Sequence, residues 1–200
     1  IKDTLYHYKK MKCCNDANIK LLMINEDEWL LRPTAWKNRI TNILKRSKNG
    51  PPARKLKISA IGQQVANSFF SMYHIQGETS GIINAMAAFN DNDDIVAVMA
   101  FNKQRNTGKI ELIRYCTSGS SHAGVFSRLF SHSVKTFGYN AVISFADLKH
   151  SSGEVYQKNG FSEVYNIRPD YRYVIRDRTY HKSSFTKSKI KKKYGVEAKT

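Results

Sequence analysis

Apolar residues return at helical spacing, or lie between helix start and stop signals, in five stretches of the chain. These stretches span residues 3–15, 35–47, 63–73, 125–137 and 153–158. Thr34 follows a break at Pro33 and predicts an N-cap for the second helix. In the third helix, Val65, Phe69 and Met72 share one side and predict the surface that faces the core.

Runs of apolar and β-branched residues predict a series of strands. They span residues 19–25, 57–61, 81–89, 95–102, 109–117, 141–146, 161–167 and 171–175. The segments 90–94 and 103–108 are rich in Asn, Asp and Gly, which favours hairpin turns. Several strands, then a crossover helix, a further strand and a short helix, predict the α/β class with one mixed sheet.

A linker interrupts the chain after the second predicted helix. The sequence Asn49-Gly50-Pro51-Pro52 cannot continue a helix. We therefore predict a basic strand-plus-helix segment over residues 1–50, a linker over 51–57, a main domain over 58–175 and a basic tail over 176–200. The tail is poor in aliphatic residues, so we expect it to order mainly on binding.

Composition supports a folded chain and argues against a membrane span. Hydrophobic residues make up 41% and charged residues 24% of the 200 residues, close to the globular average. The longest apolar stretch, residues 82–89, is too short to cross a bilayer. We expect a chain without membrane contact.

The charge is strongly positive and lies at the two ends. The formal net charge is +17. Lys and Arg outnumber Asp and Glu by 14 to 5 in residues 1–58 and by 9 to 2 in residues 176–200, whereas the middle is nearly balanced. Clustered cations of this kind bind the phosphates of nucleic acid.

We expect the partner to be nucleic acid, DNA rather than RNA. The residues predicted to contact it are basic side chains of the two ends: Lys37, Arg39, Lys45, Arg46, Arg172, Arg176, Arg178, Lys187, Lys189, Lys191, Lys192 and Lys193. Tyrosines alternate with arginines near residue 172, a pattern that suits stacking on bases but also core packing.

Cysteine usage and acidic residues give little reason to expect a metal. Cys13, Cys14 and Cys116 do not form a disulfide framework, and the chain has no CxxC pair, so we expect a reducing compartment and no zinc site. The run Glu26-Asp27-Glu28 favours a helix N-terminal charge cluster. Its alternative is a Mg²⁺ site.

The order and residues of 81–175 resemble the GNAT superfamily of acyltransferases. In that family a loop before a helix holds the pyrophosphate of acyl-CoA. The stretch Ser121 to Leu129 matches the loop pattern at Gly124 and Leu129 and departs from it at Ser121 and Phe126. The resemblance implies a GNAT-like fold and an acyl-CoA site that includes Gly124, Arg128 and Leu129.

A second match to that superfamily is Tyr156-Gln157-Lys158-Asn159-Gly160-Phe161, in which the tyrosine reaches the reacting centre. The resemblance also places His74 and Gln76 near the acceptor cleft. We expect His74, Asp147 and Tyr156 to be the catalytic residues, with a His–Asp pair as general base and Arg114 beside them. The alternative is a structural hydrogen-bond network that ties a loop to the sheet.

A narrower resemblance covers most of the chain. Ile24 to Trp29 (INEDEW), His74-Ile75-Gln76-Gly77, Ser127-Arg128-Leu129, Ser144-Phe145-Ala146-Asp147 and Pro169 to Tyr173 (PDYRY) follow one another as in phage proteins of the homing-endonuclease and Vsr-like type. This implies that residues 1–50 are the remnant of a nuclease-like domain whose core precedes residue 1. It also implies a phage-encoded protein in the host cytoplasm or associated with the virion.

Three functions are consistent with these features. The GNAT-like domain of a homing-endonuclease-type protein would bind DNA and position it, as the basic ends and the altered loop favour. Alternatively, the chain is an acyl-CoA-dependent N-acyltransferase that modifies a nucleobase or a protein amine. A third interpretation is a structural nucleic-acid-binding component of a phage complex with protein partners. Because the Phe126 ring would crowd a phosphate in the loop, Phe126→Ala is expected to gain acyl-CoA binding.

Overall fold

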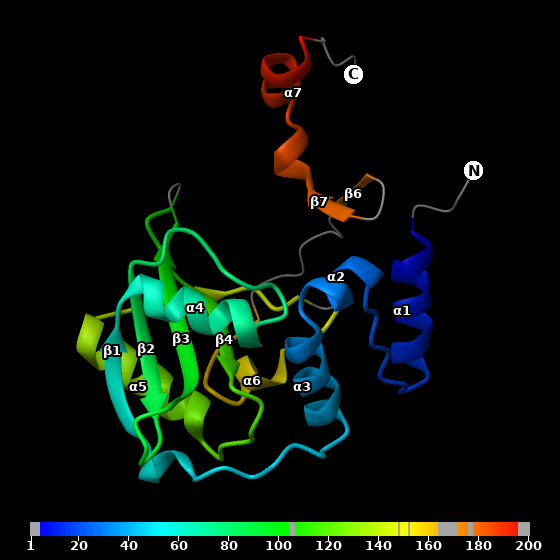
Figure 1. The fold of residues 1–200 in the computed structure, drawn as a ribbon. Coiled ribbons are helices and arrows are strands. Elements are labelled where there is room, and N and C mark those ends of the chain that lie inside the picture. The colour runs from blue at the N-terminus through cyan, green and yellow to red at the C-terminus, as the bar shows by residue number, and fades with distance from the viewer. Residues whose placement is uncertain are drawn as a thin grey trace. The chain divides into compact units, whose positions relative to one another are not determined.

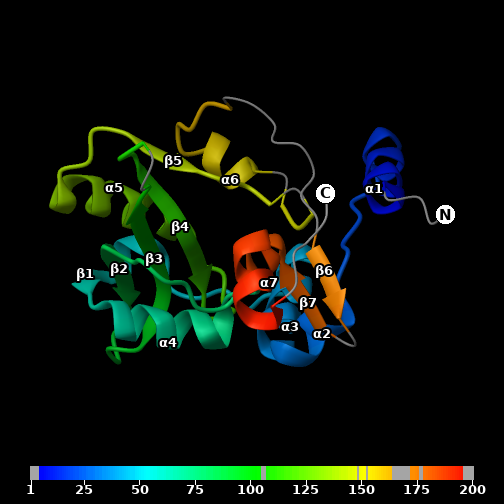
Figure 2. The same cartoon turned by 90° about the horizontal axis from the view of Figure 1, so that it is seen from above.

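A computed structural model describes residues 5–104, 107–147, 149–151, 153–163, 172–175 and 178–195 (Figures 1 and 2). The chain divides into two units, each held by its own contacts. The central unit is Leu31–Glu163, and the terminal unit combines Ile1–Leu30 with Val164–Thr200. This division differs from the scheme expected from sequence, and a nuclease remnant over residues 1–50 stays a prediction.

The central unit is built on a five-stranded mixed sheet. Its strands lie in the order β1 (Lys57–Ile61), β2 (Asn84–Phe89), β3 (Ile95–Lys103), β4 (Ile110–Thr117) and β5 (Val142–Ser144). The first four are antiparallel neighbours, and β4 and β5 are parallel. The predicted α/β class with one mixed sheet is confirmed.

Two helices cover opposite faces of the sheet (Figures 1 and 2). They are α4 (Gln63–Tyr73) and α5 (Val125–Phe137). Met99 and Phe101 of β3 pack in the cluster that includes Leu129 of α5, and the alternate residue Val98 packs in the cluster with α4. Strands buried on both faces explain why β2 and β3 read as continuous apolar runs.

The face that α4 turns to the sheet differs from the predicted one. Ala66 and Phe70 are fully buried, whereas Val65 and Met72 are about half exposed. The predicted core face of α4 was therefore wrong for Val65 and Met72. Ala66 and Phe70 lie four residues apart on one side of the helix, and the small Ala66 lets the helix approach the sheet closely.

Helix α3 (Pro33–Ile43) begins and ends earlier than predicted. Pro33 occupies the first turn and Arg32 is the N-cap residue, so Thr34 is inside the helix and does not cap it. Proline suits this position because its missing N–H has no helical acceptor there. Trp36 is the largest side chain that α3 buries.

Several predicted elements near the chain ends are shorter or absent. The expected strand over 19–25 is not a strand, and residues 161–163 are not in a strand, while 164–167 lie outside the described residues. The strand expected over 141–146 is reduced to β5, and the short helix is α6 (Glu154–Gln157). Between α3 and β1 lies a 3-10 turn, η1 (Ala53–Lys55).

The terminal unit contains helices and a hairpin of its own. These are α1 (Tyr6–Asp16), the start of α2 (Glu26–Leu31), β6 (Arg172–Ile175), β7 (Arg178–His181), η2 (Lys182–Phe185) and α7 (Lys187–Tyr194). Strand β6 pairs with β7 in a separate two-stranded sheet. The expectation that it would complete the main sheet was wrong, and the expected tail carries regular structure over residues 178–194. In the described residues, no helix has the length and apolar character needed to cross a membrane.

Candidate functional site

The site is built where β4 continues beyond its pairing with β5 and contacts the start of α5, since Tyr115 packs against Phe126. Their parallel ladder joins Ile110, Glu111 and Leu112 to Val142, Ile143 and Ser144. Strand β4 continues to Thr117, but in the described residues no ladder joins it to β5 beyond Leu112. Backbone groups between parting strands need other partners, and an inserted amide chain can supply them.

Gly124 forms the helix start next to the unpaired end of β4. Gly124 is the N-cap of α5 with φ 76, in the left-handed region, where glycine avoids the strain that a Cβ would cause. Ala123, Gly124 and Ser127 are exposed. The first amides of a helix attract anions, so the start of α5 is open to a phosphate.

Residues 48–53 cover the beginning of the loop that precedes α5. The Ser121 N–H donates to the Lys48 carbonyl at 2.8 Å, and the Gly50 N–H donates to the Ser121 carbonyl at 2.8 Å. The Ala53 N–H donates to the Ala123 carbonyl at 2.9 Å. These bonds engage the backbone at Ser121, and the Val125 N–H donates to the His122 carbonyl at 3.2 Å. The amides that follow Val125 at the start of α5 are the open part of the loop.

His122 holds that covering segment in place, a role that no sequence pattern indicated. Its ring is buried, and its Nδ1 lies 2.9 Å from the Pro51 carbonyl oxygen. A Cβ added to Gly50 would overlap the ring. The missing side chain at Gly50 therefore lets the linker pack on the loop.

Two of the three predicted cofactor residues do not face a ligand. The Arg128 guanidinium donates to the Ala53 carbonyl, and Leu129 is fully buried in the core. Gly124 remains at the open helix start. The start of α5 at Gly124 and the unpaired edge of β4 therefore suit acyl-CoA, whereas the side chains of Arg128 and Leu129 are engaged within the protein, and their role in binding the cofactor stays a prediction.

Phe126 also differs from its expected role. Its ring is 6% exposed and packs against Tyr115, with ring centroids 4.9 Å apart, and against Tyr156 at 6.0 Å. The ring thus points into the core and does not crowd the loop, so the expected obstacle to phosphate binding is absent.

Tyr156 lies on α6 and contacts the residues that pack between α5 and β4. It is half-buried, packs on Phe126 and contacts Phe161 with ring centroids 5.4 Å apart. Its hydroxyl group is near enough to Arg114 for the two to interact electrostatically. Tyr156 and His74 are the two predicted catalytic residues that interact electrostatically with Arg114.

His74 ends α4 with its ring edge-on to Phe70, at a centroid distance of 5.9 Å. Its Nδ1 accepts the backbone N–H of Gln76 at 3.1 Å. Burial, and then the positive charges of Arg114, Arg32 and Arg39, lower the pKa of His74 to about 3. His74 is therefore neutral near pH 7 and a weak base.

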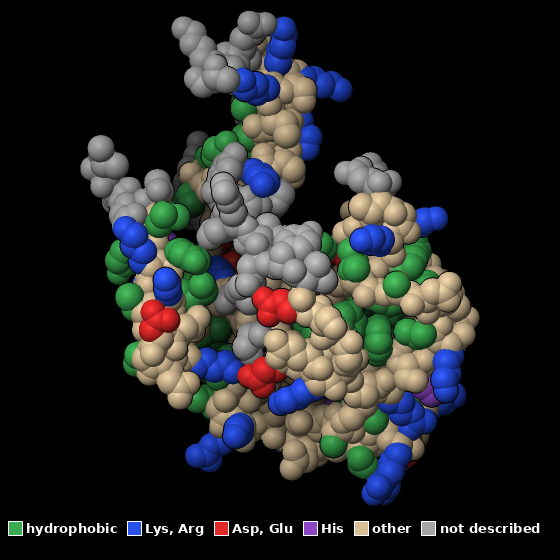
Figure 3. Space-filling model, turned by 180° about the vertical axis from the view of Figure 1, so that it is seen from behind, with side chains coloured by type: hydrophobic (Ala, Val, Ile, Leu, Met, Phe, Trp, Pro, Cys, Tyr) green, Lys and Arg blue, Asp and Glu red, His purple; other side chains and the backbone are tan. Residues whose placement is uncertain are grey.

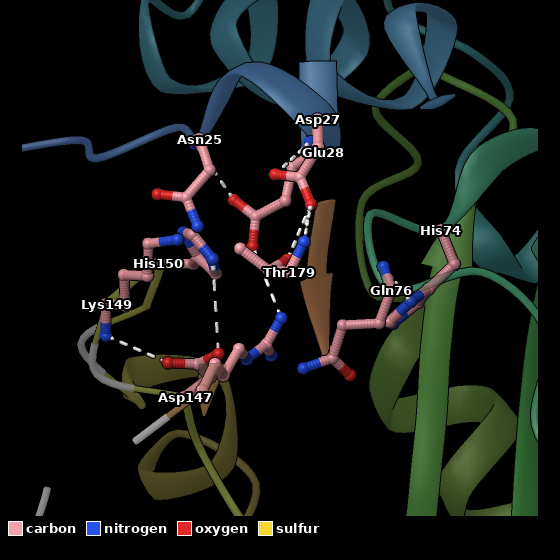
Figure 4. A network of polar contacts seen from close by, with 10 residues as sticks. Asn25, Asp27, Glu28, His74, Gln76, Asp147, Lys149, His150 and Thr179 are labelled. Atoms are coloured by element: carbon pink, nitrogen blue, oxygen red, sulfur yellow. Dashed lines mark hydrogen bonds and ion pairs between the residues drawn. The ribbon is translucent and has the colours of Figure 1, made fainter. Parts of the chain in front are cut away.

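Asp147 does not form the expected pair with His74. Its Oδ1 accepts the Lys149 N–H at 3.0 Å, and its Oδ2 lies 4.0 Å from His150 Nε2 (Figure 4). In the part of the chain that the structure describes, no hydrogen bond or ion pair joins Asp147 to His74. The predicted His–Asp general-base pair is not formed.

In the terminal unit, the acidic run of α2 binds the C-terminal hairpin. Asp27 Oδ2 accepts the Thr179 N–H at 2.8 Å and the Thr179 hydroxyl at 2.6 Å (Figure 4). Burial raises the pKa of Asp27, but these hydrogen bonds outweigh it and hold the pKa below its usual 3.8. Arg172 Nη1 lies 3.6 Å from Glu28 Oε1. Asp27 and Glu28 thus have structural partners.

Most predicted nucleic-acid contacts are exposed cations. Exposed side chains are Lys37, Lys45, Arg46, Arg172, Arg178, Lys187, Lys189, Lys191, Lys192 and Lys193. Lys and Arg are more widespread than Asp and Glu on the face shown in Figure 3. Arg39 is half-buried and donates to the His150 carbonyl. Arg176 lies outside the described residues.

No family model matches the chain, and no curated protein matches it. Among solved structures, it is similar to an aminoglycoside 6′-N-acetyltransferase from Acinetobacter baumannii, with 14% identity over 60% of this chain and 99% of that chain and a TM-score of 0.41. It is also similar to a putative acetyltransferase from Deinococcus radiodurans, with 9% identity over 64% and 93% and a TM-score of 0.44.

A third similar structure is a ribosomal-protein-alanine N-acetyltransferase from Brucella melitensis, with 13% identity over 60% of this chain and 99% of that chain and a TM-score of 0.38. At these identities and TM-scores, the three likenesses do not assign this chain to a family. They do not transfer a substrate to this chain. The phage and homing-endonuclease interpretation stays a prediction.

Proposed function

We propose that the central unit is an acyl-CoA-dependent N-acyltransferase domain of GNAT type. The observation that carries the proposal is that β4 continues past the end of its pairing with β5 at Leu112, and that this stretch contacts a helix that starts at a left-handed Gly124. The unpaired edge of β4 suits an extended amide chain, and the helix start suits a phosphate. A pantetheine arm joined to a pyrophosphate has both groups.

When bound, acyl-CoA supplies an activated acyl thioester. In our proposal, the amides at the start of α5 bind its phosphates, and the unpaired edge of β4 orients its amide chain. Tyr156 would donate a hydrogen bond at the reacting centre. With a pKa of about 3, His74 is suited to orient an acceptor as a neutral hydrogen-bonding group, and not to remove its proton.

Calorimetric titration of the full chain with CoA and acetyl-CoA tests this proposal. Ser127 is exposed in the first turn of α5, so Ser127→Glu places a negative charge beside the bound phosphates. We expect at least about tenfold weaker binding, because like charges a few ångströms apart repel by about 1 kcal/mol or more.

Thr136→Glu is the matched control, because it adds the same charge at an exposed position in the last turn of the same helix. Its CoA affinity should stay within about twofold of the parent, since the added charge is far along the helix and screened by salt. An unaltered chain that binds no CoA at millimolar concentration would refute the proposal, as would equal losses in the two variants.

A second candidate function, binding of DNA, is favoured by helix α7. Its eight residues include five lysines and no acidic residue. Such a helix neutralises phosphates and releases counterions, so binding should weaken steeply as salt rises. The two functions are compatible if the acyl acceptor is a nucleobase or a DNA-bound protein.

An electrophoretic shift titrated with salt tests DNA binding. Lys187→Gln with Lys192→Gln removes two exposed cations from α7, and we expect the slope of log K against log salt to fall by about two. Lys109→Gln with Lys135→Gln removes two exposed cations of the central unit and serves as control. Equal slopes for both double variants would overturn the role of α7, and stronger binding of RNA would overturn the preference for DNA.

A further inference from the structure

Three arginines gather around His74 from separate elements of the central unit. Arg32 precedes α3, Arg39 lies on α3 and Arg114 lies on β4. All three act electrostatically on His74. Arg114 Nε donates to the Gly77 carbonyl at 3.4 Å, and a Cβ on Gly77 would overlap the Arg32 guanidinium. Gly77, with φ +67, therefore lets both side chains approach the same turn.

Of the acidic groups, Glu111 acts electrostatically on Arg114, so one carboxylate stands against the three cations of the cluster. Among the described residues, no ion pair joins Arg32, Arg39 or Arg114 to a carboxylate. Arg114 Nη1 donates to the Ile113 carbonyl at 2.8 Å, and Arg39 donates to the His150 carbonyl. Carbonyl groups satisfy hydrogen-bond donors but do not neutralise charge, so three cations remain within one small region.

Two buried donors without acceptors lie on α3. Arg39 Nε and Trp36 Nε1 are buried and have no hydrogen-bond partner among the described residues. Both side chains contact His150: the Trp36 ring lies edge-on to the His150 ring at 5.0 Å, and Arg39 donates to the His150 carbonyl. Buried N–H groups are nearly always satisfied in folded proteins, so these two point to a missing acceptor.

We propose that Arg32, Arg39 and Arg114 form a binding site for a phosphate group. A phosphate dianion balances more of the three charges than a carboxylate does, and it offers more acceptor oxygens to the planar guanidinium forks. Because His74 Nδ1 accepts a hydrogen bond from Gln76, the neutral ring carries its hydrogen on Nε2 and has a further donor for the ligand.

The proposal does not rest on acyl transfer, since none of these side chains belongs to the start of α5. The phosphate has two possible sources: a small phosphomonoester or the phosphodiester backbone of a nucleic acid. Both present the same oxyanion to the arginines, and they differ in charge and in the size of the attached groups.

Calorimetric titration of the full chain with inorganic phosphate tests the site, with acetate at equal ionic strength as the competing anion. We expect saturable phosphate binding and much weaker acetate binding. Arg32→Gln and Arg114→Gln should each weaken phosphate binding by about tenfold or more, the effect of losing a hydrogen bond to a charged group. Lys135→Gln, which removes an exposed cation from the last turn of α5, should change it by less than about twofold.

A second measurement keeps the test decisive if Arg114→Gln impairs folding. Arg114→Lys keeps the charge and loses the planar fork, so it should also weaken phosphate binding. In the parent, the His74 pKa followed by NMR should rise when phosphate binds. Absence of phosphate binding, acetate binding of equal strength, or an equal loss in Lys135→Gln would overturn the site. Equal affinity for a dinucleoside monophosphate would assign the phosphate to a polynucleotide, and preference for adenosine 5′-monophosphate would assign it to a small phosphomonoester.

Discussion

Replacing Phe126 by alanine should destabilise the central unit and should not open the cofactor loop. The Phe126 side chain is 6% exposed and packs against Tyr115, Phe130 and Tyr156. Removing a buried phenyl ring costs about 3–5 kcal/mol in lost transfer free energy and cavity formation. For a unit of roughly 130 residues, that loss lowers the unfolding midpoint by about 10–18 °C.

Thermal and denaturant unfolding of Phe126→Ala measures this loss, and Phe145→Ala is the matched control. Phe145 is 48% exposed, so the same substitution there should change the free energy of unfolding by less than about 1 kcal/mol. CoA binding, measured in parallel below the unfolding midpoint, should not improve in Phe126→Ala. A Phe126→Ala chain as stable as the parent, with a gain in CoA affinity, would refute the packing argument and restore the ring as an obstacle.

Three further outcomes follow from individual contacts. Gly77→Ala should destabilise the central unit by about 1–3 kcal/mol, because φ +67 strains an alanine and its Cβ overlaps Arg32. Denaturant unfolding measures this loss. Gly62→Ala is the control, because a Cβ added there meets nothing within 4 Å. Asp27→Asn should destabilise the terminal unit by about 1 kcal/mol. Because the folded pKa of Asp27 is lowered, this stabilisation is present above pH 4 and lost as pH falls further. The rates of proteolysis of the C-terminal hairpin in the parent and in Asp27→Asn should therefore become equal at low pH. The His74 ring should show no titration by NMR between pH 5 and 8, since its pKa is about 3, and a midpoint near 6.5 would contradict the arginine cluster.

Local patterns predicted the elements whose signals are complete within a few residues. The bounds of β1, α4 and α5 agree with the sequence prediction. Gly62 separates β1 from α4, and Gly124 and Gly138 flank α5. The strand expected over 19–25 failed because an apolar run alone does not supply a pairing partner. The predicted α4 face was right for the buried Phe69 and wrong for Val65 and Met72, because only packing on the sheet decides between neighbouring sides of a helix.

The site was predictable where one short motif builds it and not where distant segments meet. Gly124 and Tyr156 follow from the loop and the later tyrosine motif. The cover over the loop depends on contacts between Pro51 and His122, 71 residues apart, and the arginine cluster depends on Arg32 and Arg114 meeting at Gly77. No spacing rule brings such residues together, because the sheet order decides which loops become neighbours.

The bond between Asp27 and Thr179 spans 152 residues of sequence, and this has a consequence for synthesis. The first thirty residues leave the ribosome long before the segment that pairs with them is made. At about 5–20 residues per second, they wait roughly ten to thirty seconds while the central unit is completed. During that interval the exposed apolar residues of this nascent segment are accessible to chaperones and proteases. In a stalled or truncated chain they would stay accessible.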